Sequence, residues 1–166
     1  MRLDRLAGLL FALCACCAQA QLMPIDPDWK EVEAPPPPAL DTNRLIRIDV
    51  ERSALDFGVA PASIAVGDDG IVRYVVVATS KTGAVNAMYE AVRCRTGEVK
   101  TYARHHPGSG WAIAKDPQWQ ALHDNRSRHS LVIARTGACL GHGVNGTPAQ
   151  IIRALRSPVD TRFTQP

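Results

Sequence analysis

The chain has 166 residues, a net charge of +3 at pH 7 and 46% hydrophobic residues. This length suggests one domain, and the near-neutral charge argues against a nucleic acid or another polyanion as partner. Beyond the first 20 residues no apolar run approaches membrane-spanning length, so we expect no transmembrane segment in the mature chain.

The chain begins with MRLDRLAGLLFALCACCAQA, which has the pattern of a secretory signal peptide. Arg2 and Arg5 supply the positive start, a short apolar run follows, and small residues stand where a signal peptidase reads. We expect this segment to direct export to the periplasm, with cleavage between Ala20 and Gln21. The alternative is a lipoprotein signal, in which Cys16 becomes the lipid-modified first residue and anchors the protein in the envelope.

Residues 21–43 are expected to form a proline-rich extended arm. The run from Pro35 to Pro38 excludes a regular helix or strand and favours polyproline II. Trp29 is an unusual residue for such a stretch, and we expect its ring to dock on the folded domain. The alternative is a simple exposed side chain.

Residues 44–158 are predicted to form one α+β domain, and residues 159–166 a flexible tail. A strand is expected at residues 44–50, where apolar and polar residues alternate, and a short strand with a turn at residues 63–70.

A β-hairpin is predicted for residues 70–95, because two runs rich in Val and Tyr flank Ser-Lys-Thr-Gly. If Thr79 faces Ala84 across this turn, two favourable cross-strand pairs result. They are an ion pair between Arg73 and Glu90 and an aromatic pair between Tyr74 and Tyr89.

A third strand is expected from Glu98 to His105, with Tyr102 opposite Ala91. This register places the side chains of Tyr74, Tyr89, Arg93 and Tyr102 on one face of the sheet. The other face is more purely aliphatic, and we take it as the core.

Two helices and one more strand complete the domain. We expect a helix in residues 116–124, capped by Asp116, and a strand in residues 130–134. The clearest helix follows Thr147, which forms a capping box with Gln150. The predicted fold is therefore an antiparallel β-sheet meander with two short helices, of the α+β class.

Several stretches resemble the cryptic-neisserial-protein-like family of exported proteobacterial proteins. The resemblance rests on Trp29-Lys30-Glu31 with the following prolines, DDGIVRYVVVATSKTGAVNAMYEAVRC (68–94), EVKTYAR (98–104), GSGW (108–111) and DPQW (116–119). It implies a periplasmic or envelope location. It implies no catalytic residue.

Cys94 and Cys139 are the two cysteines left after signal cleavage. An even pair in an exported chain indicates a disulfide, with two separate buried thiols as the alternative. Cys139 lies close to His142, but catalytic Cys–His pairs meet through the fold and not at this spacing.

No catalytic or metal-binding motif stands out elsewhere. The histidines do not have the spacing of a metal site, and we expect them to be exposed loop residues: His105, His106, His123, His129 and His142. We therefore expect no cofactor and no metal.

The predicted tyrosine face suggests a non-enzymatic binding module. Tyr74, Tyr89, Arg93 and Tyr102 could hold a glycan, a peptide or another envelope protein. In the alternative interpretation a helix, such as residues 147–157, covers this face and the tyrosines are core. A second functional hypothesis is a periplasmic hydrolase with an unrecognised site.

Overall fold

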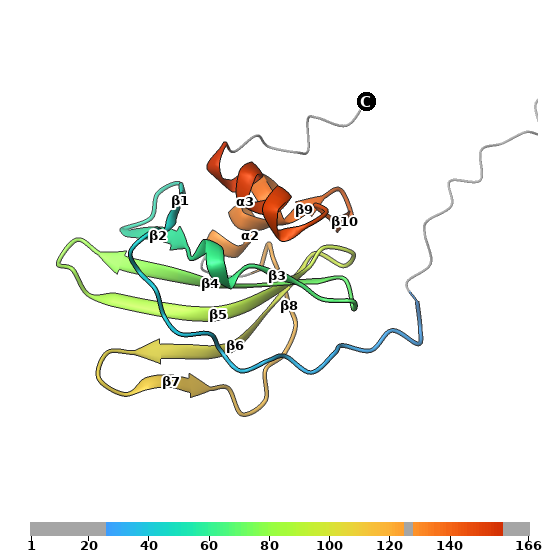
Figure 1. Ribbon diagram of the computed structural model, residues 1–166, viewed down its shortest axis with the longest axis horizontal. Coiled ribbons are helices and arrows are strands. Elements are labelled where there is room, and N and C mark those ends of the chain that lie inside the picture. Colours follow the sequence, from blue (N-terminus) through green and yellow to red (C-terminus); the bar gives the residue numbers. More distant parts are fainter. Residues whose placement is uncertain (1–25, 125–127, 158–166) are drawn as a thin grey trace, which may run out of the picture.

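The predicted hairpin forms the centre of the fold. In the computed structural model, which describes residues 26–124 and 128–157, β4 (Ile71–Ser80) pairs antiparallel with β5 (Val85–Arg93). All but the last two residues of β4 are buried, because both faces of the sheet are covered. Helices cover one face and the N-terminal arm crosses the other (Figure 1).

The hairpin loop is one residue shorter than predicted from the sequence. Ser80 pairs with Ala84, since the Ser80 amide donates to the Ala84 carbonyl at 2.9 Å. The Gly83 amide donates to the Ser80 carbonyl, also at 2.9 Å, and Gly83 has φ of +85°. This is the three-residue loop that ends in a left-handed residue, a position that favours glycine.

The predicted pairs across this hairpin are therefore wrong. Arg73 lies opposite Ala91, and Tyr74 lies opposite Glu90. A slip of one residue turns a side chain to the other face of the sheet, so Arg73 and Glu90 point away from each other. Tyr74 lies on the helix-covered face, whereas Tyr89 and Tyr102 lie on the arm-covered face. The three tyrosines do not share one face.

The remaining strands extend the sheet on both sides of the hairpin. The order is β1-β2-β4-β5-β6-β7, and β3 pairs with β4 and β8 with β6. A bulge interrupts the β5–β6 pairing at Tyr89/Glu90, and Ala91 lies opposite Lys100, so the predicted pair of Ala91 with Tyr102 is wrong. The bounds are β1 Ile46–Ile48, β2 Leu55–Val59, η1 Pro61–Ser63, β3 Ala65–Val66, β6 Glu98–His106, β7 Gly110–Ile113 and β8 Gln120–Ala121.

The C-terminal segment supplies the helical layer. It runs through α2 (His129–Ile133), the π-helical turn η2 (Ala134–Ala138), the small hairpin of β9 (Cys139–Leu140) and β10 (Gly143–Val144), and α3 (Pro148–Arg156). Ile133, Ile151 and Leu155 from these helices pack into the core. No helix in the described residues is long and apolar enough to cross a membrane.

Two of the predicted elements are wrong, and the capped helix is confirmed. The segment 130–134 is helical, because a short apolar run suits a buried helix as well as a strand. No helix forms in residues 116–124, where β8 pairs with β6 instead. The capping box of Thr147 and Gln150 is present. The fold class, an antiparallel sheet with two short helices, is as predicted.

Candidate binding site under the N-terminal arm

In the structure the N-terminal arm extends to Leu45, two residues beyond its predicted end, and its described part, residues 26–45, crosses the face of the sheet opposite the helices (Figure 1). It contains no helix or strand, as its prolines dictate. Apolar arm residues pack against the core of this face, which includes Tyr89 and Tyr102: Trp29, Ala34, Leu40 and Leu45. The arm is therefore an integral cover of the sheet.

Trp29 docks on the domain, as the sequence suggested. Its indole Nε1 donates a hydrogen bond to the Asp69 carbonyl at 3.0 Å. The guanidinium carbon of Arg93 lies 3.5 Å from the centre of its ring, a cation–π contact. Arg93 also pairs with Glu98 at 3.8 Å. The predicted binding residue Arg93 thus holds the arm.

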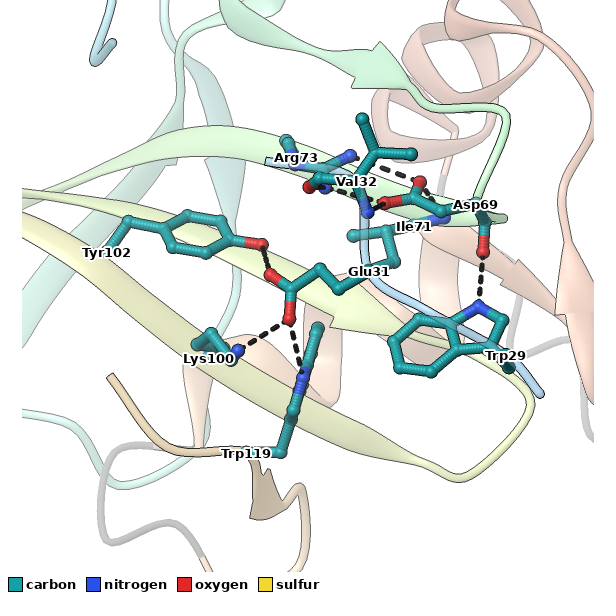
Figure 2. Close-up of polar contacts among 9 residues, drawn as sticks. All are labelled: Trp29, Glu31, Val32, Asp69, Ile71, Arg73, Lys100, Tyr102 and Trp119. Carbon is teal, nitrogen blue, oxygen red and sulfur yellow. Dashed lines mark hydrogen bonds and ion pairs between the residues drawn. The ribbon is translucent and has the colours of Figure 1, made fainter. Parts of the chain in front are cut away.

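A buried ion pair next to Trp29 anchors the arm backbone. Arg73 and Asp69 approach to 2.7 Å with side chains only 4% and 0% exposed. Arg73 donates to the Val32 carbonyl at 2.9 Å, and the Val32 amide donates to Asp69 at 3.0 Å (Figure 2). Burial alone would raise the pKa of Asp69, but the bonds from Arg73 and Val32 outweigh it and lower this pKa.

Glu31 is the second anchor of the arm. Its carboxylate accepts hydrogen bonds from Tyr102 Oη at 2.6 Å, Lys100 Nζ at 2.5 Å and Trp119 Nε1 at 3.0 Å (Figure 2). Burial raises the pKa of Glu31, yet these donors outweigh it and hold the pKa below its usual value. The pKa of Tyr102 is raised, because the hydroxyl is buried and donates to Glu31.

The proline half of the arm has a contact of another kind. Trp111 Nε1 on β7 donates to the Pro38 carbonyl at 3.0 Å. An aromatic surface that binds a polyproline II segment is a recurrent mode of peptide recognition. This face of the sheet thus already binds one extended peptide segment, its own arm.

A groove of about 600 Å³ lies between the proline half of the arm and the sheet. Tyr89 and Tyr102 form part of its wall, but the two side chains are only 3% and 8% exposed. The open part is aliphatic, because Val32 and Ile113 line it and are 54% and 63% exposed. Prolines from the arm and Pro117 complete the groove.

A second polar cluster lies on the other face of the sheet, closed to solvent. The Glu90 carboxyl lies within hydrogen-bond distance of His129 Nε2, at 3.0 and 3.1 Å, and accepts from Ser130 Oγ at 3.1 Å and Tyr74 Oη at 3.3 Å. Burial raises the pKa of Tyr74 well above its usual value. His129 is 1% exposed and stacks on Phe57, so its assignment as an exposed loop residue is wrong.

The structure divides the predicted binding residues between two places. Tyr89, Arg93 and Tyr102 lie beneath the arm, whereas Tyr74 belongs to the buried Glu90 cluster. No pattern in the sequence indicated that Glu31 and Asp69 anchor the arm. Glu31 belongs to the Trp-x-Glu pattern of the arm, and Asp69 belongs to the turn at residues 67–70. Neither pattern indicates which distant residues the side chain contacts in the fold.

The disulfide prediction is confirmed. Cys94 and Cys139 form a disulfide with a Cα–Cα distance of 5.5 Å, as predicted. In the described part of the chain, no group of three His, Cys, Asp or Glu side chains is placed to hold a metal ion. The signal cleavage site at Ala20 and Gln21, and Cys16, lie outside the described residues.

We expect Glu31→Gln to loosen the arm at neutral pH by about 1–3 kcal/mol, since the amide accepts more weakly from Lys100. In the native chain the lowered pKa of Glu31 means that this stabilisation is complete above the usual value of 4.5 and is lost as pH falls through the lowered value. Hydrogen exchange of the arm amides and tryptophan fluorescence measure the release. Glu33→Gln, on the exposed side of the arm, is the matched control. Equal pH profiles for the two variants would contradict this role of Glu31.

Comparison with known proteins places the chain in a family. The CNP1-like family matches residues 25–156, most of the chain, and the match includes the arm with both of its anchors. No curated protein and no solved structure matches the chain. The resemblance noted in the sequence is thereby confirmed, and the chain belongs to the CNP1-like family.

Proposed function

We propose that the protein is exported to the periplasm and acts there as a non-enzymatic binding module. The N-terminal pattern supports export. The observation that carries the binding role is the groove beside the arm, with its exposed aliphatic side chains Val32 and Ile113. Exposed apolar side chains that gather around one concave feature are typical of an interaction site.

The ligand that suits this groove is an extended apolar segment of another protein. A glycan would need exposed aromatic rings to stack on, and the tyrosines of this face are almost fully covered by the arm. An extended peptide requires an apolar trough and donors for its carbonyls. The arm is a precedent for such binding on this face, because its apolar residues pack on the sheet and its Pro38 carbonyl accepts from the indole of Trp111.

Binding is tested with a displayed library of random peptides selected on the mature chain. We expect enrichment of extended apolar sequences, and at least about a tenfold loss of affinity for the selected peptide with Val32→Asp, which places a charge at the groove. The Val32 side chain is exposed, so the substitution spares the core. Leu140→Asp is the control, because Leu140 is 47% exposed and belongs to β9 on the helical side of the sheet.

Two results would overturn the binding proposal. One is equal affinity for the two aspartate variants, and the other is selection of no peptide while soluble peptidoglycan fragments bind. Export is tested by the intact mass of protein recovered from the periplasm, which should begin at Gln21. An acylated species that begins at Cys16 would mean that the protein is a lipoprotein.

A further inference from the structure

Among the described residues, the end strand β7 of the sheet has no protection of its edge other than its shortness, four residues. At the other end, β1 packs beneath α3 and carries Arg47. β7 consists of Gly-Trp-Ala-Ile, without a charge or a proline, and it is the outermost strand in Figure 1. Native sheets normally blunt such an edge with charges, prolines or a covering element, because it can pair with another chain.

The backbone of β7 offers hydrogen bonds outward. The Ala114 amide donates to the Tyr102 carbonyl, and Ala112 lies opposite Arg104, so these positions bond inward to β6. Bonding direction alternates along an antiparallel strand. Trp111 and Ile113 therefore turn their N–H and C=O groups away from the sheet. Within the described residues no hydrogen bond reaches these outward groups.

The side chains of this edge form an apolar pair. Ile113 is the most exposed of the large hydrophobic residues in the described chain. Trp111 shares its face, two residues away, and both lie on the arm side. Ala112 points to the other face and is small.

We propose that two copies of the chain pair antiparallel through β7, about a two-fold axis at Ala112. In this register Trp111 of each copy faces Ile113 of the other, and these two residues exchange the outward backbone hydrogen bonds. An aromatic side chain opposite a β-branched one is a favourable cross-strand pair. The pairing would thus give the outward backbone groups of β7 hydrogen-bond partners, and it would also cover the side chain of Ile113.

Charges around the edge permit this register. Next to the strand, Lys115 would face Ser109 of the second copy, and Asp116 would face Gly108. Like charges directly opposite each other disfavour pairing, and none meet in this register. The strand has only four residues, so we expect a weak dimer whose population rises with protein concentration.

This dimer goes beyond the proposed binding role, because it rests on the backbone of the edge strand and not on a ligand. The two proposals share Ile113, which would lie at the rim of the groove in contact with Trp111 of the second copy. It would place both grooves on the same side of one continuous sheet. Trp111 of each copy would then stand beside the groove of the other.

The dimer is tested with a cysteine at position 112, which lies on the proposed two-fold axis. In the proposed register Ala112 faces itself in a pair without mutual hydrogen bonds, with Cα atoms about 4.5 Å apart, a distance that a disulfide can bridge. Ala112→Cys should give mostly covalent dimer on mild oxidation, seen as doubled mass on a non-reducing gel. Leu140→Cys, an exposed position in β9, should remain mostly monomeric.

A second variant separates specific pairing from random collision. Adding Ile113→Glu to Ala112→Cys places like charges at the edge, and we expect at least about a tenfold slower cross-linking. The proposal is overturned if Ala112→Cys cross-links no faster than Leu140→Cys, or if Ile113→Glu leaves the rate unchanged. Circular dichroism confirms that each variant is folded. The peptide-binding test uses neither position of the edge, so either proposal can fail alone.

Discussion

Glu90→Ala is expected to lower the free energy of unfolding by about 3–5 kcal/mol, the usual cost of removing one member of a buried pair. Glu90 and His129 are each 1% exposed and lie 3.0 Å apart at their closest atoms. Without the carboxyl, the hydroxyls of Ser130 and Tyr74 also lose their acceptor in a region closed to water. Several buried polar groups would therefore lose a partner from a single change.

Urea unfolding followed by circular dichroism measures this effect. Glu51→Ala is the control, because Glu51 is exposed and its loss should cost less than about 0.5 kcal/mol. Glu90→Gln keeps the size and one acceptor oxygen, so we expect an intermediate loss. If Glu90→Ala costs less than about 1 kcal/mol, the cluster does not stabilise the fold.

The same cluster shows what sequence patterns could and could not predict. The hairpin, the alternating strands and the capped helix α3 depend on local signals, and the structure contains them. The partners of Glu90 lie 16 residues away at Tyr74, and 39 and 40 residues away at His129 and Ser130. No local pattern specifies which distant donors meet one buried carboxyl.

The error in the hairpin register has a local cause with distant consequences. Ser-Lys-Thr-Gly fits both a four-residue loop and a three-residue loop that follows Ser80. Choosing the longer loop moved Tyr74 to the wrong face and created an Arg73–Glu90 pair. In the structure, Arg73 instead pairs with Asp69, four residues before it in the preceding turn.

The arm explains why both faces of the central strands are apolar. α2 and α3 cover one face only, and a sheet exposed to water on the other would show polar residues there. Ile71, Val75 and Val77 lie on that second face and are buried under or beside the arm. The docking of Trp29 was expected from the sequence, but the role of the arm as the second layer of the core was not.

Removing the disulfide should cost nearly as much as removing Glu90. Cys94 follows β5, and Cys139 begins β9 directly after the turn η2, so the bond ties the helical segment to the sheet. The closed loop spans 45 residues, for which the chain-entropy relation gives about 4 kcal/mol. A domain has only about 5–15 kcal/mol in total.

We therefore expect the double variant Cys94→Ala/Cys139→Ala to remain folded but to melt at a much lower temperature. It should still fold because Ile133, Ile151 and Leu155 continue to pack the helices on the sheet. Hydrogen exchange should accelerate first in α2 and α3, the elements that the bond tethers. The native chain under reducing conditions should show the same loss, which separates the effect of the bond from that of the alanines. Two free thiols in unfolded, unreduced native protein, or a loss below about 1 kcal/mol, would contradict this stabilising role of the bond.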